Sequence, residues 1–257
     1  MIALPAEAKA IINHYGLSEP LTLGHMRLYE KAGLRVLISG ASERLMTKAF
    51  GFLEARGIEK HHGFLNIGIA GGDRKMLGHA FHISTIKQAK HKTFYPTITN
   101  TKESLATLTS LSDDHTGHND ASLTDQEGHA FFDMATRFVP QEQVALIKVV
   151  SDYNPEGMRK ITASSCTELI KAHINTIEET ISHLKVRSMQ EALVHRTIDI
   201  TPFCKRWHLT HSQKKQLQTL LQQALVHECA LDLEHCASAD ELLRTITQRL
   251  NQHNYNF

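Results

Sequence analysis

The segment from Val144 to Val150 is the feature that most limits how this chain can fold. Its residues are apolar except for Lys148. A short apolar run of this kind, rich in β-branched residues, is typical of a strand that is buried on both faces. Such a strand needs a covering layer on each side, so the segment predicts an α/β architecture.

Strand patterns and helix patterns alternate along the first 185 residues. Two further strand patterns lie at 36–39 and 64–69. Ser42 can cap one helix, and Gly16 can end another in the left-handed conformation. We therefore predict a central mixed, mainly parallel sheet with helices on both faces. Apolar residues recur at helical spacing in the segments 4–15, 45–53, 130–138 and 170–184.

The composition of the chain changes after Leu184. Residues 186–257 contain no glycine, and two capping boxes, at Thr210 and Ser238, each open a leucine-rich helical pattern. We predict an α/β domain over residues 1–185 and a helical extension over 186–257. The apolar stripes of the extension should be buried on the first domain or on a partner chain, which makes a homodimer the default expectation. These stripes are Leu217, Leu220, Leu221 and Leu225, and Leu242, Leu243, Ile246 and Leu250.

The charge balance and the cysteines exclude several classes of protein. The chain has 28 lysines and arginines against 27 aspartates and glutamates, without a basic stripe, so binding of nucleic acid by bulk charge is not expected. Its apolar runs are far shorter than the roughly 20 residues that a membrane-spanning helix needs. Four cysteines are scattered along a large chain. We therefore expect a cytoplasmic protein whose partner is a small molecule.

The 18 histidines raise the question of a metal site. The sequence has neither an HExxH nor a CxxC motif, and His61 and His62 adjoin a glycine in a predicted turn, where solvated imidazoles are common. Two further clusters fit a polar loop and a helix surface. We expect no metal and no other cofactor. The clusters are Asp113, Asp114, His115, His118 and Asp120, and His227, Cys229, Glu234, His235 and Cys236.

Polar or glycine-rich segments follow the predicted strands, at the edge of the sheet where open α/β proteins bind their ligands. Each segment by itself is common as a turn or as the start of a helix. Their order along the chain carries more information. The segments are Leu4–Glu7 after a short first strand, Gly68–Gly72, Asp125–Gly128 and Ser151–Asn154.

In order and spacing, these segments resemble the motifs of the purine nucleoside phosphorylase and methylthioadenosine/S-adenosylhomocysteine nucleosidase superfamily, over about residues 1–185. The resemblance implies the nucleoside phosphorylase-like α/β fold and an enzyme that cleaves the N-glycosidic bond of a purine-type nucleoside. It rests on Ala3-Leu4-Pro5-Ala6-Glu7, Ser39-Gly40-Ala41-Ser42, Asn66-Ile67-Gly68-Ile69-Ala70-Gly71-Gly72, Asp125-Gln126-Glu127-Gly128 and Val149-Val150-Ser151-Asp152.

The residue types suit this chemistry. Cleavage passes through an oxocarbenium-like sugar, which needs carboxylates to hold its hydroxyls and an acid to protonate the departing base. We expect Glu7 to activate water, Glu127 to hold the ribose and Asp152 to protonate the base. Each of these carboxylates also has a plain structural interpretation, as a helix-start residue or a turn cap. The other expected substrate-binding residues are Ile69, Ala70, Gly71 and Gln126.

Hydrolysis is preferred to phosphorolysis because the first loop has Glu7 and no arginine, and Ile69 stands where phosphate-binding relatives tend to have a hydroxyl residue. A phosphorylase, with phosphate as co-substrate, and an inactive nucleoside-binding or assembly module remain the alternatives. The interval 73–124 is short for the family, so no base-stacking residues can be carried over. Phe94 and Tyr95 are candidates for stacking, although such a pair before a proline is more often ordinary packing.

Overall fold

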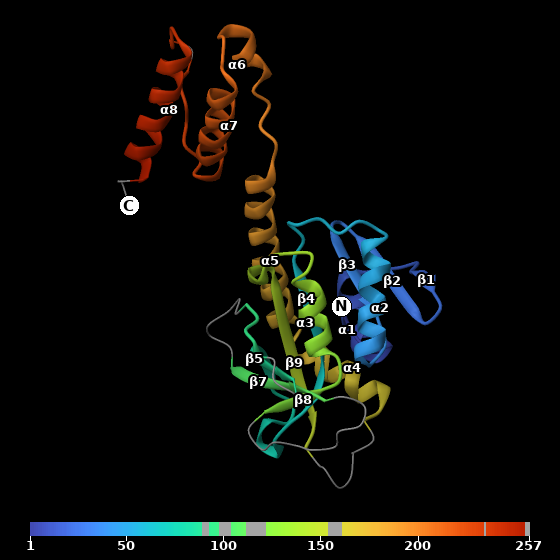
Figure 1. The fold of residues 1–257 in the computed structure, drawn as a ribbon. Coiled ribbons are helices and arrows are strands. Elements are labelled where there is room, and N and C mark those ends of the chain that lie inside the picture. The colour runs from blue at the N-terminus through green and yellow to red at the C-terminus, as the bar shows by residue number, and fades with distance from the viewer. Residues whose placement is uncertain (89–92, 98–103, 112–121, 154–160, 234, 255–257) are drawn as a thin grey trace. The chain divides into compact units, whose positions relative to one another are not determined.

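The computed structural model of the chain describes residues 1–88, 93–97, 104–111, 122–153, 161–233 and 235–254 (Figure 1). It divides into two compact units, Met1–Ser188 and Met189–Phe257. The predicted boundary after residue 185 lies within the long helix α5 (Ile174–His195), which continues across the division.

The first unit is built from strands and helices in alternation. Its helices are α1 (Pro5–Tyr15), α2 (Glu43–Glu54), α3 (Gly128–Ala135), α4 (Ala163–Ala172) and the first part of α5, with short 3₁₀ helices η1 (Arg74–Met76) and η2 (Gln141–Gln143). Its strands are β1 (Leu21–Leu23), β2 (Met26–Lys31), β3 (Leu34–Ile38), β4 (Phe64–Gly71), β5 (Ala80–Gln88), β6 (Thr93–Phe94), β7 (Leu105–Ser110), β8 (Leu123–Asp125) and β9 (Val144–Asp152).

The central sheet is mixed, as predicted, but it is closed. Strands β5, β7, β8, β4 and β9 follow one another, and β9 pairs with β5 again to complete a five-stranded barrel. The longer pairings, β4 with β9 and β5 with β7, are parallel. The expectation of an open α/β sheet is wrong because β5 pairs with a strand on each side, parallel to β7 and antiparallel to β9.

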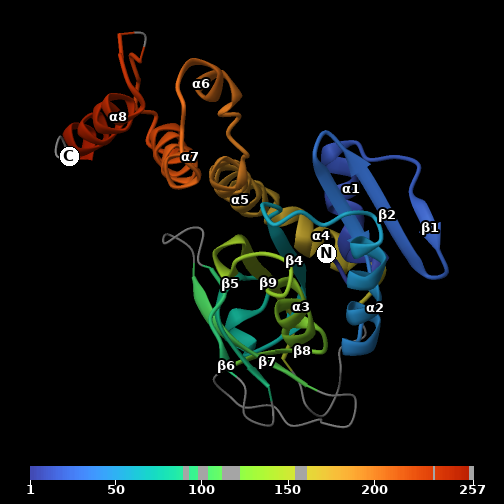
Figure 2. The same cartoon turned by 45° about the horizontal axis from the view of Figure 1, so that its top comes forward.

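Helices pack against both faces of the β4–β9 strand pair. Alternate residues of β4 and β9 contribute to two separate apolar clusters. One cluster includes residues of α2 and α3, and the other includes residues of α1, α4 and α5. Figures 1 and 2 show α3 beside β4 and β9. All of β9 from Val144 to Ser151 is buried, which confirms its predicted position between two layers.

The first residues of the chain form less of a strand than the sequence indicates. Ile2 makes only isolated parallel bridges, to Ile38 of β3 and Ile67 of β4. These bridges link the barrel to an antiparallel sheet of β1, β2 and β3, of which only the last strand is predicted from the sequence. The remaining predicted signals are confirmed: the Ser42 side chain caps α2, and Gly16 ends α1 with φ 58°.

The second unit consists of helices in its described residues: the end of α5, α6 (Thr201–Arg206), α7 (His211–Val226) and α8 (Ala239–Asn254). Thr210 and Ser238 cap α7 and α8 as predicted. Apart from Leu225, the two leucine stripes share one core, in which Leu217, Leu242 and Ile246 are fully buried. This finding corrects the expectation that the stripes must be buried on the first domain or on a partner, and the homodimer stays a prediction without that support.

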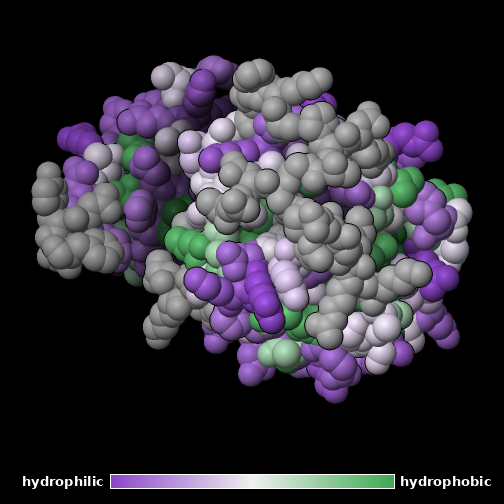
Figure 3. All heavy atoms as spheres, turned by 90° about the horizontal axis from the view of Figure 1, so that it is seen from below, coloured by the Kyte–Doolittle hydropathy of each residue, from purple (hydrophilic) through white to green (hydrophobic). Residues whose placement is uncertain are grey.

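Hydrophilic side chains make up most of the described surface on the face that Figure 3 shows, with hydrophobic residues in small groups between them. None of the helices in the described residues combines the length and the apolar character needed to cross a bilayer.

Candidate functional site

The four predicted site segments, apart from Asn154, which lies outside the described residues, meet around the carboxyl end of β4. Gly71 is in register with Thr124 on β8 and, after a bulge, with Asp152 on β9. Three segments are therefore neighbours in the barrel. They are the glycine signature (Gly68–Gly72), the Asp-x-Glu motif (Asp125–Glu127) and the Ser-Asp pair (Ser151 and Asp152). The start of α1 joins them through Glu7, whose carboxylate reaches Ile69 on β4.

Glu7 is a buried carboxyl group that ties α1 to β4. Its side chain is 2% exposed. Oε1 accepts a hydrogen bond from the Ile69 N–H (2.8 Å), and Oε2 accepts one from the Leu4 N–H (2.7 Å). Burial raises the pKa of Glu7, opposed by the Ile69 hydrogen bond and by the nearby Lys148 ammonium. Glu7 therefore caps the start of α1, as its plain structural interpretation predicts. The same two hydrogen bonds also fix the position of a carboxyl group whose pKa is raised.

Lys148 is the second structural centre of the site. Its ammonium group is fully buried and lies 2.7 Å from Asp125 Oδ2 and 2.8 Å from Glu127 Oε1. Both partner carboxylates are themselves buried. The buried ammonium of Lys148 needs these two carboxylates, because an unpaired charge in the protein interior is very costly.

Asp125 and Glu127 stand at the junction of β8 and α3. Asp125 Oδ1 accepts from the Ser110 hydroxyl (2.6 Å), and Oδ2 accepts from the Gly128 N–H (2.9 Å). Glu127 is the residue before the first turn of α3, and its side chain makes no capping bond. Asp125 therefore acts as the anchor of this corner, and Glu127 extends its carboxylate to Lys148.

Gly68 allows Glu7 and Lys148 to approach the same point of β4. A Cβ atom on this residue would lie 3.0 Å from Glu7 Oε1 and 3.3 Å from Lys148 Nζ. The two polar groups thus lie over the backbone of Gly68 from different elements. A larger residue at this position would push at least one of these two groups aside by a few tenths of an ångström.

Three carboxyl groups, those of Glu7, Asp125 and Glu127, surround one ammonium group. Burial raises the pKa of Glu127 to about 7, although the ammonium of Lys148 opposes the rise. Burial lowers the pKa of Lys148, but the two carboxylates outweigh it and hold that pKa above its ordinary value. The cluster therefore keeps its cation and can exchange a proton near neutral pH, which suits acid and base chemistry.

Asp152 lies at the end of β9, beside the glycine signature, and is partly exposed rather than buried. Its Oδ2 accepts a hydrogen bond from the Ser151 hydroxyl (2.9 Å), and its backbone carbonyl accepts from the Gly72 N–H (2.9 Å). Asp152 is thus the last residue of a strand that is buried up to Ser151, and it is the first residue of β9 to be partly exposed.

The other expected substrate-binding residues lie along the same edge. Ile69 is half-buried and its N–H is held by Glu7, whereas Ala70 is buried and its carbonyl lies 3.3 Å from the Ser151 hydroxyl. Gly71 is buried at the bulge next to Asp152. Gln126 is exposed between two buried acidic residues.

Sequence reasoning missed the role of Lys148. It noted the lysine only as an interruption of an apolar strand. The available signal was the position itself, because a lysine within a strand that is buried on both faces must find carboxylates nearby. Asp125, two residues before Glu127, was a second carboxylate that the sequence offered as a partner for this lysine.

Two other sequence expectations concern residues away from this cluster. Phe94 contacts the rings of His129 and Phe132, at centroid distances of 5.1 and 5.3 Å, and Tyr95 is 61% exposed. Phe94 is thus accounted for by packing at the start of α3. The polar cluster at 113–120 lies outside the described residues, and so does Glu234 of the second cluster.

Comparisons with solved structures identify the architecture. CT263 (MTAN) from Chlamydia trachomatis matches with a TM-score of 0.54 at 20% identity, covering 70% of this chain and 95% of that one. The 5′-methylthioadenosine/S-adenosylhomocysteine nucleosidase from Helicobacter pylori matches with a TM-score of 0.55 at 15% identity, covering 70% and 95%. This chain has the nucleoside phosphorylase-like fold.

Futalosine hydrolase of Helicobacter pylori strain 26695 has the same architecture, with a TM-score of 0.55 at 13% identity over 70% of this chain and 95% of that one. By sequence, no family model and no curated protein matches the chain. The resemblance seen in the motifs is therefore confirmed at the level of the nucleoside phosphorylase-like fold.

Proposed function

We propose that this protein is a nucleosidase that hydrolyses the N-glycosidic bond of a purine-type nucleoside. The observation that carries the proposal is the placement of Glu7 and the Lys148–Glu127 pair at Gly68 of β4, with Asp152 beside Gly71 at the carboxyl end of the same strand. Structural neighbours include a CT263 structure bound to MTA and one bound to adenine, which supports a small nucleoside as the ligand.

The proposed reaction uses Glu7 as the base. A water molecule held by Glu7 and by the ammonium of Lys148 attacks the anomeric carbon, and Glu7 takes a proton from that water. The carboxylate of Glu127 accepts hydrogen bonds from ribose hydroxyls, which strengthen as positive charge develops on the sugar. The reaction as proposed needs no metal and no other cofactor.

Asp152 supplies the proton for the leaving base. As the glycosidic bond breaks, its electron pair passes to a purine ring nitrogen, and protonation of the base prevents its return. The position of Asp152 at the open end of β9, where the chain leaves the barrel, suits contact with a base rather than with the buried ribose site. Ser151 orients the carboxyl group through its 2.9 Å hydrogen bond.

The charges of the site favour water over phosphate as the attacking group. A phosphate dianion needs cations that are free to pair with it. The ammonium of Lys148 already pairs with two carboxylates, and Glu7 would repel an anion. The Ile69 N–H, which could donate to an anion, instead donates to Glu7.

The test is release of free base from 5′-methylthioadenosine, adenosine and inosine, followed by chromatography. We expect turnover of at least one of them and a loss of about 100-fold or more in Glu7→Gln. Glu43→Gln is the matched control, since Glu43 is an exposed first-turn glutamate of α2. If these nucleosides raise the melting temperature without release of base, the protein is a binding module and the proposal is wrong.

A further inference from the structure

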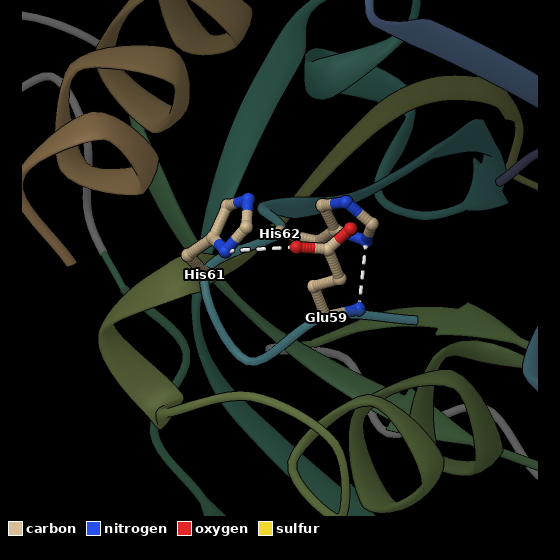
Figure 4. A group of neighbouring side chains, drawn as sticks. All are labelled: Glu59, His61 and His62. Atoms are coloured by element: carbon tan, nitrogen blue, oxygen red, sulfur yellow. Dashed lines mark hydrogen bonds and ion pairs between the residues drawn. The ribbon is translucent and has the colours of Figure 1, made fainter. Parts of the chain in front are cut away.

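The turn between α2 and β4 brings three metal-ligating side chains together. Glu59, His61 and His62 each have a ligand atom within 4.8 Å of those of the other two (Figure 4). His61 Nδ1 lies 3.4 Å from Glu59 Oε2. In a tetrahedral zinc site, bonds of about 2.0–2.1 Å place the donor atoms roughly 3.4 Å apart. This pair already has the separation that a shared ion requires.

The backbone of the turn is held in place by residues from other elements. The buried Gln143 donates a hydrogen bond from Nε2 to the Lys60 carbonyl (3.2 Å). The Ser188 hydroxyl donates to the His61 carbonyl. These bonds fix the two peptide groups that precede His61 and His62, so the three side chains meet on a defined scaffold. Pre-organisation of this kind is what a metal site needs.

His62 also presents a nitrogen lone pair toward Glu59. The N–H of Glu59 donates to His62 Nδ1 (3.1 Å), so this nitrogen carries a lone pair. An ion bound there would replace the N–H as partner of that lone pair.

We propose that Glu59, His61 and His62 bind one Zn²⁺ ion, with water in the fourth position. Two imidazoles and one carboxylate are a donor set that zinc accepts. The turn enters β4 at Phe64, ahead of Gly68 and Ile69, so the ion would fasten the start of the strand and take no part in nucleoside cleavage. The proposal is independent of the proposed function.

A calorimetric titration of the full chain with Zn²⁺ tests this site. We expect one equivalent to bind and to raise the melting temperature. Removal of one ligand in Glu59→Ala should weaken binding by at least about tenfold, and His61→Ala/His62→Ala should abolish this equivalent. The side chains are partly exposed, so the variants should keep the parent's melting temperature in EDTA.

His208→Ala/His211→Ala is the matched control, because it also removes two histidines, both exposed and in the second unit. Binding in this control should equal that of the parent. Titration with Co²⁺ gives a second readout: visible absorption without a sulfur-to-metal band is expected, and it should be lost in His61→Ala/His62→Ala. Unchanged Zn²⁺ affinity in that variant, or a sulfur-to-metal band that it retains, would overturn the proposal.

Discussion

Lys148 shows how one buried charge can organise a site. Its ammonium sits in the barrel wall, where an unpaired charge would be far too costly, and the carboxylates of Asp125 and Glu127 meet it at 2.7 and 2.8 Å. The pair joins β9 to the corner between β8 and α3. It also determines where the Glu127 carboxylate points. The carboxylate that neutralises Lys148 is therefore the one proposed to bind the ribose.

Loss of this ammonium should destabilise the protein strongly. Lys148→Met leaves two buried carboxylates without a cation, which should lower the free energy of unfolding by about 3–5 kcal/mol in urea denaturation. The double variant Lys148→Met/Glu127→Gln should recover part of this loss, because one of the stranded charges is then gone. A loss below about 1 kcal/mol in the single variant would contradict the assigned ion pair.

The raised pKa of Glu127 should make stability depend on pH. Its pKa is about 7 in the folded protein, against an ordinary value of 4.5, so the folded state binds this proton more tightly. The stabilisation is present at low pH and is lost as pH rises through 7. Relative to Glu127→Gln, the parent's unfolding free energy should fall by about 2 kcal/mol between pH 5.5 and pH 8 in urea denaturation. If the parent's unfolding free energy relative to Glu127→Gln stays constant or rises over this range, the pKa of Glu127 is not raised in the folded protein.

At the scale of elements, the predicted features are those with local causes. The helix caps at Ser42 and Thr210 follow from short-range hydrogen bonds, and the burial of β9 follows from its apolar run. Closure of the barrel depends on β5 pairing with β9, which are far apart in the chain. No periodicity records such a contact. Strand β1 was missed because it is short and exposed.

In the candidate site, too, features with local causes could be predicted, and features that depend on strand pairing could not. The order of the four segments was enough to predict Glu7 and Glu127 as neighbours of the glycine signature. Their side-chain partners depend on which strands lie together, so the pairing with Lys148 could be inferred only in part. The degree of exposure of Asp152 depends on where the helices stop covering β9, which a single sequence does not record.

Gly68 on β4 should be more important for turnover than for stability. In Gly68→Ala the new Cβ would press against Glu7 Oε1 and Lys148 Nζ, both ends of flexible side chains. We expect base release to fall by about tenfold or more through displacement of Glu7, with a loss of unfolding free energy below about 2 kcal/mol.

Gly51→Ala is the matched control for this substitution. Gly51 lies within α2, and a Cβ there would meet no atom within 4 Å. The control should keep full turnover and gain about 0.5–1 kcal/mol in unfolding free energy. Equal turnover in the two variants would show that the space over Gly68 does not position Glu7.

At the scale of the whole molecule, the chain combines a site-bearing unit with a helical unit that has its own core. All candidate site residues belong to Met1–Ser188. The second unit buries its leucine stripes internally, so its stability should be measurable apart from the activity of the first.

Leu217→Ala tests this independence. Leu217 is fully buried in the core of the second unit, and its truncation should cost that unit about 2–5 kcal/mol. Thermal unfolding should show a lower first transition, while base release below that temperature stays at the parent's rate. Loss of base release in the folded variant would mean that the helical unit contributes to catalysis.

The buried carboxylates should direct water, rather than phosphate, to the sugar. The most direct measurement is base release in phosphate-free buffer, with the sugar product identified by chromatography. We predict full activity without phosphate, free pentose as the product, and no increase in rate when phosphate is added. Strict dependence on phosphate, with a sugar 1-phosphate as the product, would contradict hydrolysis.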